Sequence, residues 1–219
     1  MYLSRVKIDY NNRHKLKDLT HVGAYHHWVE QCFPQEVSNG ERSRKLWRID
    51  RLNGDDYLLV LSNNRPEIRG LLKYGEENTA VIKDYDAYLA GLQEGANMRF
   101  RVTLTPVKSV KNTEDFDKPN VKRKRGKVCR LIGVQSQMDF LINRAEKNGF
   151  SVDANGFYIS SQQYVTLQKT NQKPEKFLKV DYEGVLTITD IDLFRRVLIN
   201  GLGKKKAYGC GLITVLPVV

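Results

Sequence analysis

Three of the four histidines in this chain, His21, His26 and His27, lie within seven consecutive positions. Imidazole is the side chain whose unperturbed pKa lies near neutral pH, so it can take a proton from a ribose 2′-hydroxyl or give one to a leaving 5′-oxygen. At helical spacing the apolar stripe of this segment consists of Val22, Tyr25, Val29 and Phe33. His26 is adjacent to that stripe and His27 lies ~100° further round the helix. The pattern predicts His26 at the edge of a groove.

Two other interpretations of these histidines stay open. They can be ordinary residues on a helix surface, or His21 and His27 can bind a metal ion. No P-loop, HExxH, GxSxG or paired-carboxylate motif occurs elsewhere in the sequence. Any chemistry is therefore expected among the histidines, and neither a metal site nor a cofactor is predicted.

A glycine- and lysine-rich segment precedes the last apolar run of the chain. Its members are Gly201, Gly203, Gly209, Gly211, Lys204, Lys205 and Lys206. Glycine lets the main chain approach a ligand closely and adopt positive φ, so such a loop can offer backbone N–H groups and ammonium groups to phosphates. The alternative is a turn with solvated lysines, and the loop by itself favours neither.

Two further basic clusters lie in the same half of the chain. The first is predicted to occupy a single loop and consists of Lys122, Arg123, Lys124, Arg125, Lys127 and Arg130. The second is expected on a projecting hairpin around residues 171–174 and consists of Lys169, Lys173, Lys176 and Lys179. A run of like charge is usually a solvated arm. Because three basic clusters occur in one half of the chain, we predict that they converge on one groove. This groove would bind RNA through its phosphates and bases.

The composition supports a polyanionic partner. The 219 residues include 36 Lys and Arg against 25 Asp and Glu, a formal charge of +11. No apolar stretch of about 18 residues or more occurs, which argues against a membrane. The three cysteines, Cys32, Cys129 and Cys210, match no zinc or disulfide pattern, and no signal peptide is evident, so a cytoplasmic protein is expected.

The first half of the chain alternates strand and helix patterns. We expect a strand at 3–8, an amphipathic helix at 20–33, strands at 44–50 and 57–61, a helix-poor stretch through 82–85 and a linker at 89–95. The sequence Asn53-Gly54 between the two middle strands is a hairpin signal.

The second half repeats the plan. We expect a strand at 97–106, a helix at 136–148, strands at 165–168 and 177–189, a helix at 190–200 and a final strand. Gly149 and Gly201 are predicted to end the helices and Asp190 to cap the second. Strand, helix, two strands, helix, strand is the split βαβ arrangement, an α+β fold common among RNA-binding proteins. The predicted domains are 1–90 and 96–219.

Several segments, in order through nearly the whole chain, carry a resemblance to a known family. They are Met1–Val6, His26 to Phe33-Pro34, Arg99–Arg101 with Pro106, Tyr182–Thr187 and Gly201–Leu212. They resemble the CasE family, the CRISPR repeat endoribonucleases of type I-E Cascade. The most specific part is the pattern Gly-x-Gly-x-x-Lys-x-x-Gly-x-Gly, in which Lys206 takes the lysine position.

The resemblance implies two tandem ferredoxin-like (RRM-like) βαββαβ domains. It also implies binding of a CRISPR repeat stem-loop in precursor RNA and metal-independent cleavage at the 3′ base of the stem. In that reaction the 2′-hydroxyl attacks the neighbouring phosphate and leaves a 2′,3′-cyclic or 3′-phosphate and a 5′-hydroxyl. The enzyme then stays on its product together with other Cascade subunits.

The resemblance places the family's catalytic histidine at His26. Some members have a tyrosine three positions earlier, where this chain has Gly23. Tyr25 or His27 can supply the second group, and the cation that stabilises the transition state is not assigned. The alternative function is a non-catalytic module that binds structured RNA; a reader of double-stranded DNA is less favoured because no helix-turn-helix or zinc motif is present.

Overall fold

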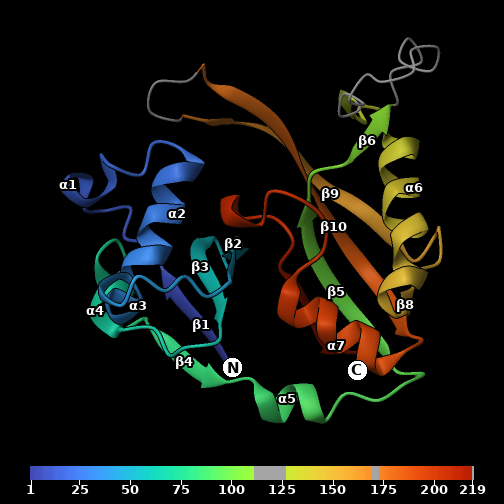
Figure 1. Cartoon of the computed structure of the whole chain (residues 1–219), viewed down its shortest axis with the longest axis horizontal. Coiled ribbons are helices and arrows are strands. Elements are labelled where there is room, and N and C mark those ends of the chain that lie inside the picture. Colours follow the sequence, from blue (N-terminus) through green and yellow to red (C-terminus); the bar gives the residue numbers. More distant parts are fainter. Residues whose placement is uncertain (111–126, 169–172, 219) are drawn as a thin grey trace, which may run out of the picture.

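The first of two antiparallel sheets is built from the N-terminal part of the chain. The computed structural model describes residues 1–110, 127–168 and 173–218 (Figure 1). The strands are β1 (Tyr2–Lys7), β2 (Lys45–Leu52), β3 (Asp55–Ser62) and β4 (Val81–Asp84), in the spatial order β2-β3-β1-β4. The helices are α1 (Arg13–Leu16), α2 (Val22–Gln31), α3 (Pro34–Ser38) and α4 (Ile68–Leu72). With α2 and α4 as the crossovers, this is the βαββαβ order of a ferredoxin-like fold.

The second sheet has the same topology. Its strands are β5 (Asn97–Leu104), β8 (Phe150–Ser151), β9 (Phe157–Leu167), β10 (Glu175–Ile188) and β11 (Ile213–Pro217), in the order β11-β5-β10-β8 with β9 also paired to β10. Its helices are α6 (Val134–Ala145) and α7 (Ile191–Asn200). The predicted α+β fold with two tandem ferredoxin-like units is confirmed.

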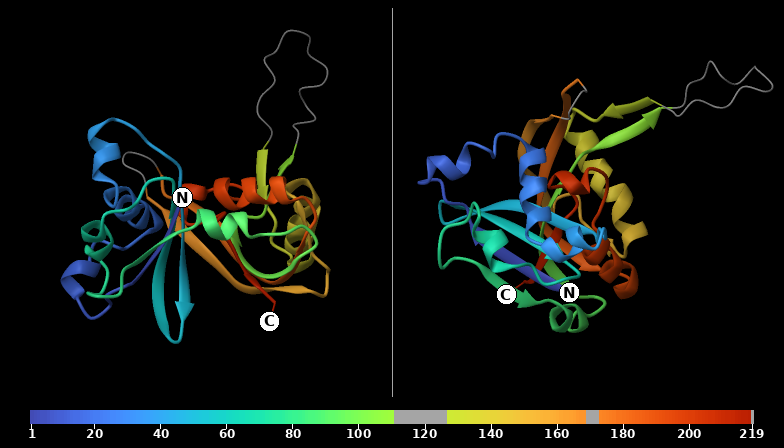
Figure 2. Two further views of the ribbon diagram at one scale, coloured as in Figure 1. Left: turned by 90° about the horizontal axis from the view of Figure 1, so that it is seen from below. Right: turned by 60° about the vertical axis from the view of Figure 1, so that its left-hand side comes forward.

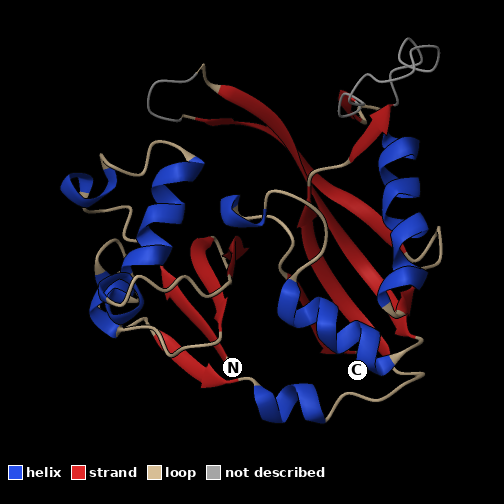
Figure 3. Ribbon diagram, viewed as in Figure 1, coloured by secondary structure: helices blue, strands red, loops and turns tan. Residues whose placement is uncertain are grey.

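Two hydrophobic cores hold the helices against the sheets (Figure 3). The first core packs α2 and α4 on the N-terminal sheet through Val6, Trp28, Leu58, Val60 and Leu71. The second packs α6 and α7 on the C-terminal sheet through Phe140, Leu141, Tyr182, Phe194 and Leu198. Such burial of apolar area is the main source of stability in each unit.

Helix ends follow the sequence signals. The Asp190 carboxylate accepts a hydrogen bond from the Leu193 N–H at 2.8 Å, so it caps α7 as predicted. Gly201 ends α7 at φ 74° and Gly149 follows α6 and its last 3-10 turn at φ 76°. At Gly149 a Cβ would lie 2.3 Å from the Asp190 carbonyl oxygen, so this tight crossing requires glycine.

One arginine joins the two halves. Arg48 on β2 is 3% exposed and binds both Asp50 carboxylate oxygens, at 2.6 and 2.8 Å. The same guanidinium donates to the carbonyl oxygens of Arg101 and Leu212 on the second half, each at 2.8 Å. Because these partners come from both sheets, the guanidinium fixes one unit against the other.

A small apolar cluster also lies between the halves. Val22 at the start of α2 packs with Leu167, Phe177 and Cys210, and Tyr208 is partly buried against them. The cluster therefore brings the histidine-bearing helix, the β9–β10 hairpin and the glycine-rich loop together. Among the described residues no helix is long and apolar enough to cross a membrane.

Some expected elements differ from the observed ones. The stretch expected to be poor in helix, which follows the strand at 57–61 and runs through 82–85, contains α4. The expected linker at 89–95 overlaps α5 (Asp86–Ala90). Both helices have five residues, too few to show a clear period. The strand expected at 165–168 extends back to Phe157. The sequence does not predict this first part, because most of its residues are exposed and they do not alternate in polarity.

The prediction of a single basic loop at 122–130 is wrong at its C-terminal end. Lys127 and Arg130 lie on β7 (Lys127–Arg130), which pairs with β6 (Val107–Val110). The four residues of β7, Lys-Val-Cys-Arg, do not alternate in polarity, so the sequence gives no period-2 signal for this strand. Lys122, Arg123, Lys124 and Arg125 lie outside the described residues.

Candidate functional site

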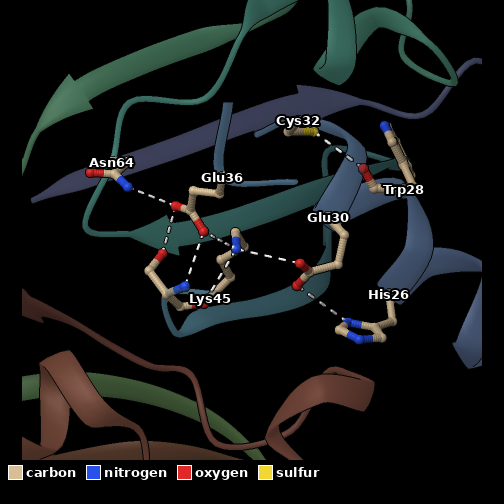
Figure 4. A network of polar contacts seen from close by, with 8 residues as sticks. His26, Trp28, Glu30, Cys32, Glu36, Lys45 and Asn64 are labelled. Atoms are coloured by element: carbon tan, nitrogen blue, oxygen red, sulfur yellow. Dashed lines mark hydrogen bonds and ion pairs between the residues drawn. The ribbon is translucent and has the colours of Figure 1, made fainter. Parts of the chain in front are cut away.

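His26 lies where α2 meets the glycine-rich loop. Its side chain is 36% exposed, and its Nδ1 is 4.0 Å from Oε1 of Glu30, one helical turn on (Figure 4). The Tyr208 ring stands edge-on to the imidazole, with 5.9 Å between ring centroids. Tyr208 ends the 3-10 turn η3 (Lys206–Tyr208) within the loop. The histidine-bearing helix and the glycine-rich loop are far apart in the sequence. The structure brings these two candidate segments into contact.

The surroundings of His26 keep its imidazole neutral. Burial lowers the pKa of His26 below the ordinary value of 6.5, the positive charges of Lys45 and Arg42 and the nearby His27 lower it further, and Glu30 opposes them. A ring with a lowered pKa is unprotonated at neutral pH and can accept a proton. Glu30 favours the tautomer that carries its proton on Nδ1, which leaves the Nε2 lone pair free.

A buried ion-pair network holds Glu30 in place (Figure 4). The Lys45 ammonium, on a side chain 2% exposed, is 3.4 Å from Glu30 and 2.7 Å from Glu36. Burial raises the pKa of Glu36, but hydrogen bonds from Lys45, Ser43 and Asn64 outweigh it and lower the pKa to about 2. The Lys45 ammonium, itself held by Glu36, therefore positions the carboxylate beside His26.

The other two histidines of this segment, His21 and His27, have local partners. His21 caps α2, because its Nδ1 accepts the Gly23 N–H at 3.1 Å. The exposed His27 has its Nε2 2.7 Å from Nε2 of Gln31. The two rings are thus engaged separately and do not form a joint ligand pair.

Tyr25 points to a different surface of α2 from His26. Its ring stacks on Trp47, with 5.9 Å between centroids and 20° between planes. Burial raises the pKa of Tyr25, with a smaller contribution from Asp56. Tyr208, which sequence analysis did not single out, is the tyrosine in contact with His26.

The glycine-rich loop is docked on β2. All four glycines have positive φ, at 74°, 78°, 75° and 89° for Gly201, Gly203, Gly209 and Gly211. The Trp47 indole N–H donates to the Ala207 carbonyl oxygen at 3.0 Å. A Cβ on Gly209 would lie 2.7 Å from the Trp47 ring, so glycine is required there for close docking.

The loop presents its lysines more than its backbone N–H groups. The N–H groups of Gly201 and Gly211 donate within the protein, to Val197 and Thr103 carbonyl oxygens, both at 2.7 Å. Lys204 is exposed, whereas Lys205 is half-buried and pairs with Glu175 at 2.7 Å. The Glu175 contact also ties the loop to the start of β10.

Two cations from different halves meet at one carbonyl oxygen. Lys206 Nζ and Arg44 Nη1 donate to the Asn200 carbonyl oxygen, at 2.7 and 3.3 Å. Burial, and then the charge of Arg44, lower the pKa of Lys206. Arg42 lies in the same segment as Arg44, just before β2, and it is close enough to His26 to lower the pKa of the imidazole. Arg42 and Arg44 were missed in the sequence, although the run Arg-Ser-Arg-Lys before β2 is a visible signal.

The remaining basic residues are only partly brought together. Lys173 and Lys176 are exposed near the tip of the β9–β10 hairpin, and Arg130 lies over the Tyr164 ring of β9 at 5.7 Å. Lys179 does not project from the hairpin as expected: it is partly buried, 5.2 Å from the centroid of the Trp47 ring. Position 179 lies deep in β10, where the strand reaches the first half. Lys169 is outside the described residues.

Comparison with known proteins gives a consistent result. A family model described as CRISPR associated protein matches residues 1–217. The CRISPR-associated endoribonuclease Cse3 of Thermus thermophilus is 25% identical over 99% of this chain and 100% of its own length. The CRISPR system Cascade subunit CasE of Escherichia coli is 32% identical over 58% of this chain and 61% of its own.

Solved structures have the same fold. Thermus thermophilus Cse3, bound to an RNA representing a pre-cleavage complex, superposes with a TM-score of 0.78 at 22% identity, over 99% of this chain and 98% of that one. The CRISPR-associated protein Cas6e of Escherichia coli gives a TM-score of 0.60 at 21% identity, with both chains fully covered.

Proposed function

The chain belongs to the CRISPR associated protein family matched above, and we propose that it is an endoribonuclease that processes CRISPR repeat RNA. It binds the repeat stem-loop in precursor RNA and cleaves at the 3′ base of the stem without a metal ion. It then remains on the product in the cytoplasm as a subunit of Cascade. The observation that carries this proposal is the contact of His26 with the lysine-bearing loop. The relatives named for endoribonuclease activity and for Cascade support it.

His26 is the proposed general base. Its free Nε2 takes the proton of the ribose 2′-hydroxyl, and the oxygen attacks the adjacent phosphorus. The bond from phosphorus to the 5′-oxygen breaks, and the products are a 2′,3′-cyclic phosphate and a 5′-hydroxyl. A lowered pKa suits this step, because the base form is already present at neutral pH.

Tyr208 is the proposed second polar group of the site. Its ring already contacts His26, whereas Tyr25 is stacked on Trp47 and His27 pairs with Gln31. A phenol hydroxyl can give its proton to the leaving 5′-oxygen or hold the attacking ribose in place. Tyr208 thus takes the place of the tyrosine that this chain lacks at Gly23.

Lys206, with Arg42 and Arg44, is the proposed phosphate-binding group. None of the three pairs with a carboxylate among the described residues. Lys206 and Arg44 meet at the Asn200 carbonyl oxygen, and Arg42 lies close enough to His26 to lower its pKa. The extra negative charge on phosphorus in the transition state is stabilised best by such pre-positioned donors. Lys204, Lys173, Lys176, Lys127 and Arg130 would extend the binding surface along the RNA.

The chemistry of the cut tests this proposal. Full-length protein is incubated in excess EDTA with a repeat hairpin RNA and with the same RNA carrying a single 2′-deoxy residue at the 3′ base of the stem. We expect one cut, a cyclic or 3′-phosphate end and no cleavage of the 2′-deoxy RNA. Binding without cleavage would instead indicate the non-catalytic RNA-binding module, and cleavage only with added Mg²⁺ would refute the mechanism.

A further inference from the structure

A cavity of about 530 Å³ lies between the two halves and takes no part in the mechanism above. Its walls come from α2, β2, β9, β10 and the glycine-rich loop, elements that converge at the centre of Figure 1. Tyr25 and Gly209 line it, and these are the sequence neighbours of His26 and Tyr208. The volume lies within the ~300–1,000 Å³ typical of ligand pockets. The cavity is thus next to the proposed active site but formed by other side chains.

Lys179 gives the cavity an unpaired hydrogen-bond donor. Its ammonium lies 5.2 Å from the centroid of the Trp47 ring, and among the described residues no carboxylate or hydrogen-bond acceptor engages it. Burial lowers the pKa of Lys179, against smaller opposing effects of Cys210 and Asp181. Lys179 is partly buried and its ammonium lies over the Trp47 ring, so its N–H groups stay available to donate to a ligand acceptor in the cavity.

Asp181 supplies a matching acceptor two residues along β10. Alternate residues of a strand share one face, and both Lys179 and Asp181 line the cavity. One Asp181 oxygen accepts the Thr103 hydroxyl. The other oxygen is left to accept from a ligand. A donor and an acceptor therefore stand side by side on one wall.

Aromatic rings form much of the remaining wall. Trp47 stacks with Tyr25, and Tyr10 and Tyr164 also line the cavity. The Tyr10 hydroxyl is held by Asp56 at 2.9 Å. Trp47 is covered by Tyr25 and Lys179, whereas Tyr10 and Tyr164 are 50% and 55% exposed and offer ring surface. Exposed aromatic rings bind bases of single-stranded RNA by stacking.

We propose that this cavity binds one unpaired guanine base. The O6 and N7 atoms of guanine accept from Lys179, while its N1–H group donates to the Asp181 oxygen that Thr103 leaves free. Adenine shares the N7 acceptor but has an N6–H₂ donor in place of O6, and its N1 is an acceptor that cannot donate to Asp181. The guanine can belong to a single-stranded part of the bound RNA or to a free nucleotide. Only the first source rests on the proposed function.

Tryptophan fluorescence of the full-length protein tests the site directly. Both tryptophans are buried, but only Trp47 lines the cavity, whereas Trp28 packs in the N-terminal core and serves as a constant background. We expect guanosine 5′-monophosphate to change the emission and to bind at least tenfold more tightly than adenosine 5′-monophosphate. Inorganic phosphate should neither change the emission nor compete.

Matched variants locate the binding. Lys179→Met should weaken binding of guanosine monophosphate at least tenfold, and the same change at the exposed Lys147 should leave it unchanged. Asp181→Asn keeps an acceptor for Thr103 but offers the ligand a donor, so it should reduce or reverse the preference for guanine. Circular dichroism of each variant shows that it is folded, and either variant alone suffices if the other does not fold.

Four results would overturn the proposal: no response to guanosine monophosphate, equal affinity for the adenosine nucleotide, competition by phosphate alone, or unchanged binding by folded Lys179→Met. To identify the source of the guanine, a single-stranded RNA oligonucleotide with one guanine is compared with free guanosine monophosphate. Tighter binding of the oligonucleotide identifies RNA as the ligand, and weaker binding identifies the free nucleotide. RNA cleavage is assayed separately. Guanine binding without cleavage contradicts the proposed function alone, and cleavage without guanine binding contradicts this inference alone.

Discussion

His26 owes its chemical character to burial and to three charged neighbours, Lys45, Arg42 and Glu30. A buried imidazole near two cations and one carboxylate has a pKa below its ordinary value, so its neutral form persists to lower pH than in a free histidine. As a general base it is active above this pKa and loses activity as the pH falls through it.

Glu30→Gln tests this electrostatic balance. Glu30 raises the pKa of His26, and its loss also leaves the positive charge of Lys45 less compensated, so the pKa falls further. In a plot of the single-turnover cleavage rate against pH, the acidic limb should shift to lower pH. The pH profile of the variant is compared with that of Glu146→Gln, an exposed and remote control. A limb that moves to higher pH would contradict the assignment of His26 as base.

Tyr208→Phe isolates the hydroxyl of the proposed second group. The ring and its edge contact with His26 are kept, so the fold and RNA affinity should not change. If the hydroxyl transfers or positions a proton, the cleavage rate should fall about 100-fold, the lower range of acid–base effects. The rate is measured under single turnover at saturating enzyme. An unchanged rate in Tyr208→Phe would remove the hydroxyl from the mechanism.

At the scale of elements, the site depends on how closely the glycine-rich loop docks on β2. The spacing of glycines and lysines in this loop is visible in the sequence, as are the apolar stripe and the histidines of the first long helix. The contact between the loop and the helix cannot be predicted from the sequence, because about 180 residues separate His26 from Tyr208 and only the packing of two sheets brings them together. Arg42 and Arg44 were overlooked because two arginines before a strand resemble solvated charge.

The fold was predictable where periodicity was strong. The α7 helix, with its Asp190 cap and Gly201 end, was placed nearly to the residue. The exposed first part of β9 and the short α4 were missed, since neither buries an alternating or helical stripe over enough residues to show a period. Lys179 was assigned to a projecting hairpin because sequence does not reveal how far a strand continues into an interface.

Gly209→Ala tests the docking of the loop. The φ of 75° strains any residue with a Cβ, and the added atom would meet Trp47 at 2.7 Å. We expect a loss of about 2 kcal/mol in the free energy of unfolding by urea and a slower cleavage, because Tyr208 moves relative to His26. In the control Gly203→Ala the φ is similar, but the nearest atom is 3.6 Å away. That variant should lose only about 1 kcal/mol and keep its cleavage rate. Equal effects of the two variants on cleavage would contradict the docking role of Gly209.

At the scale of the whole molecule, the proposed site is shared between two ferredoxin-like units. One unit carries His26 and the other carries Lys206 and Tyr208, so the proposal requires that the units keep a fixed relation. Figure 2 shows the β2–β3 hairpin and the long strands of the second sheet diverging from a common centre. Arg48 lies at this interface, where it binds Asp50 and two carbonyl oxygens of the second half.

Arg48→Met tests this connection. It removes the hydrogen bonds that cross the interface and leaves the Asp50 carboxylate buried without its bidentate partner. Loss of one member of a buried ion pair costs about 3–5 kcal/mol, which we expect in the free energy of unfolding. Arg51→Met, at an exposed position at the end of β2, is the matched control. A change below about 1 kcal/mol in Arg48→Met would show that other contacts hold the units together.

The most direct test of the central claim is the single-turnover cleavage rate of His26→Ala on a repeat hairpin RNA in EDTA, measured together with its RNA affinity. We expect cleavage to fall at least 100-fold while the dissociation constant changes less than about threefold, because one imidazole supplies proton transfer and little binding energy. His14→Ala, an exposed histidine on α1, should match the wild type in both. Cleavage by His26→Ala at the wild-type rate would contradict the proposed site.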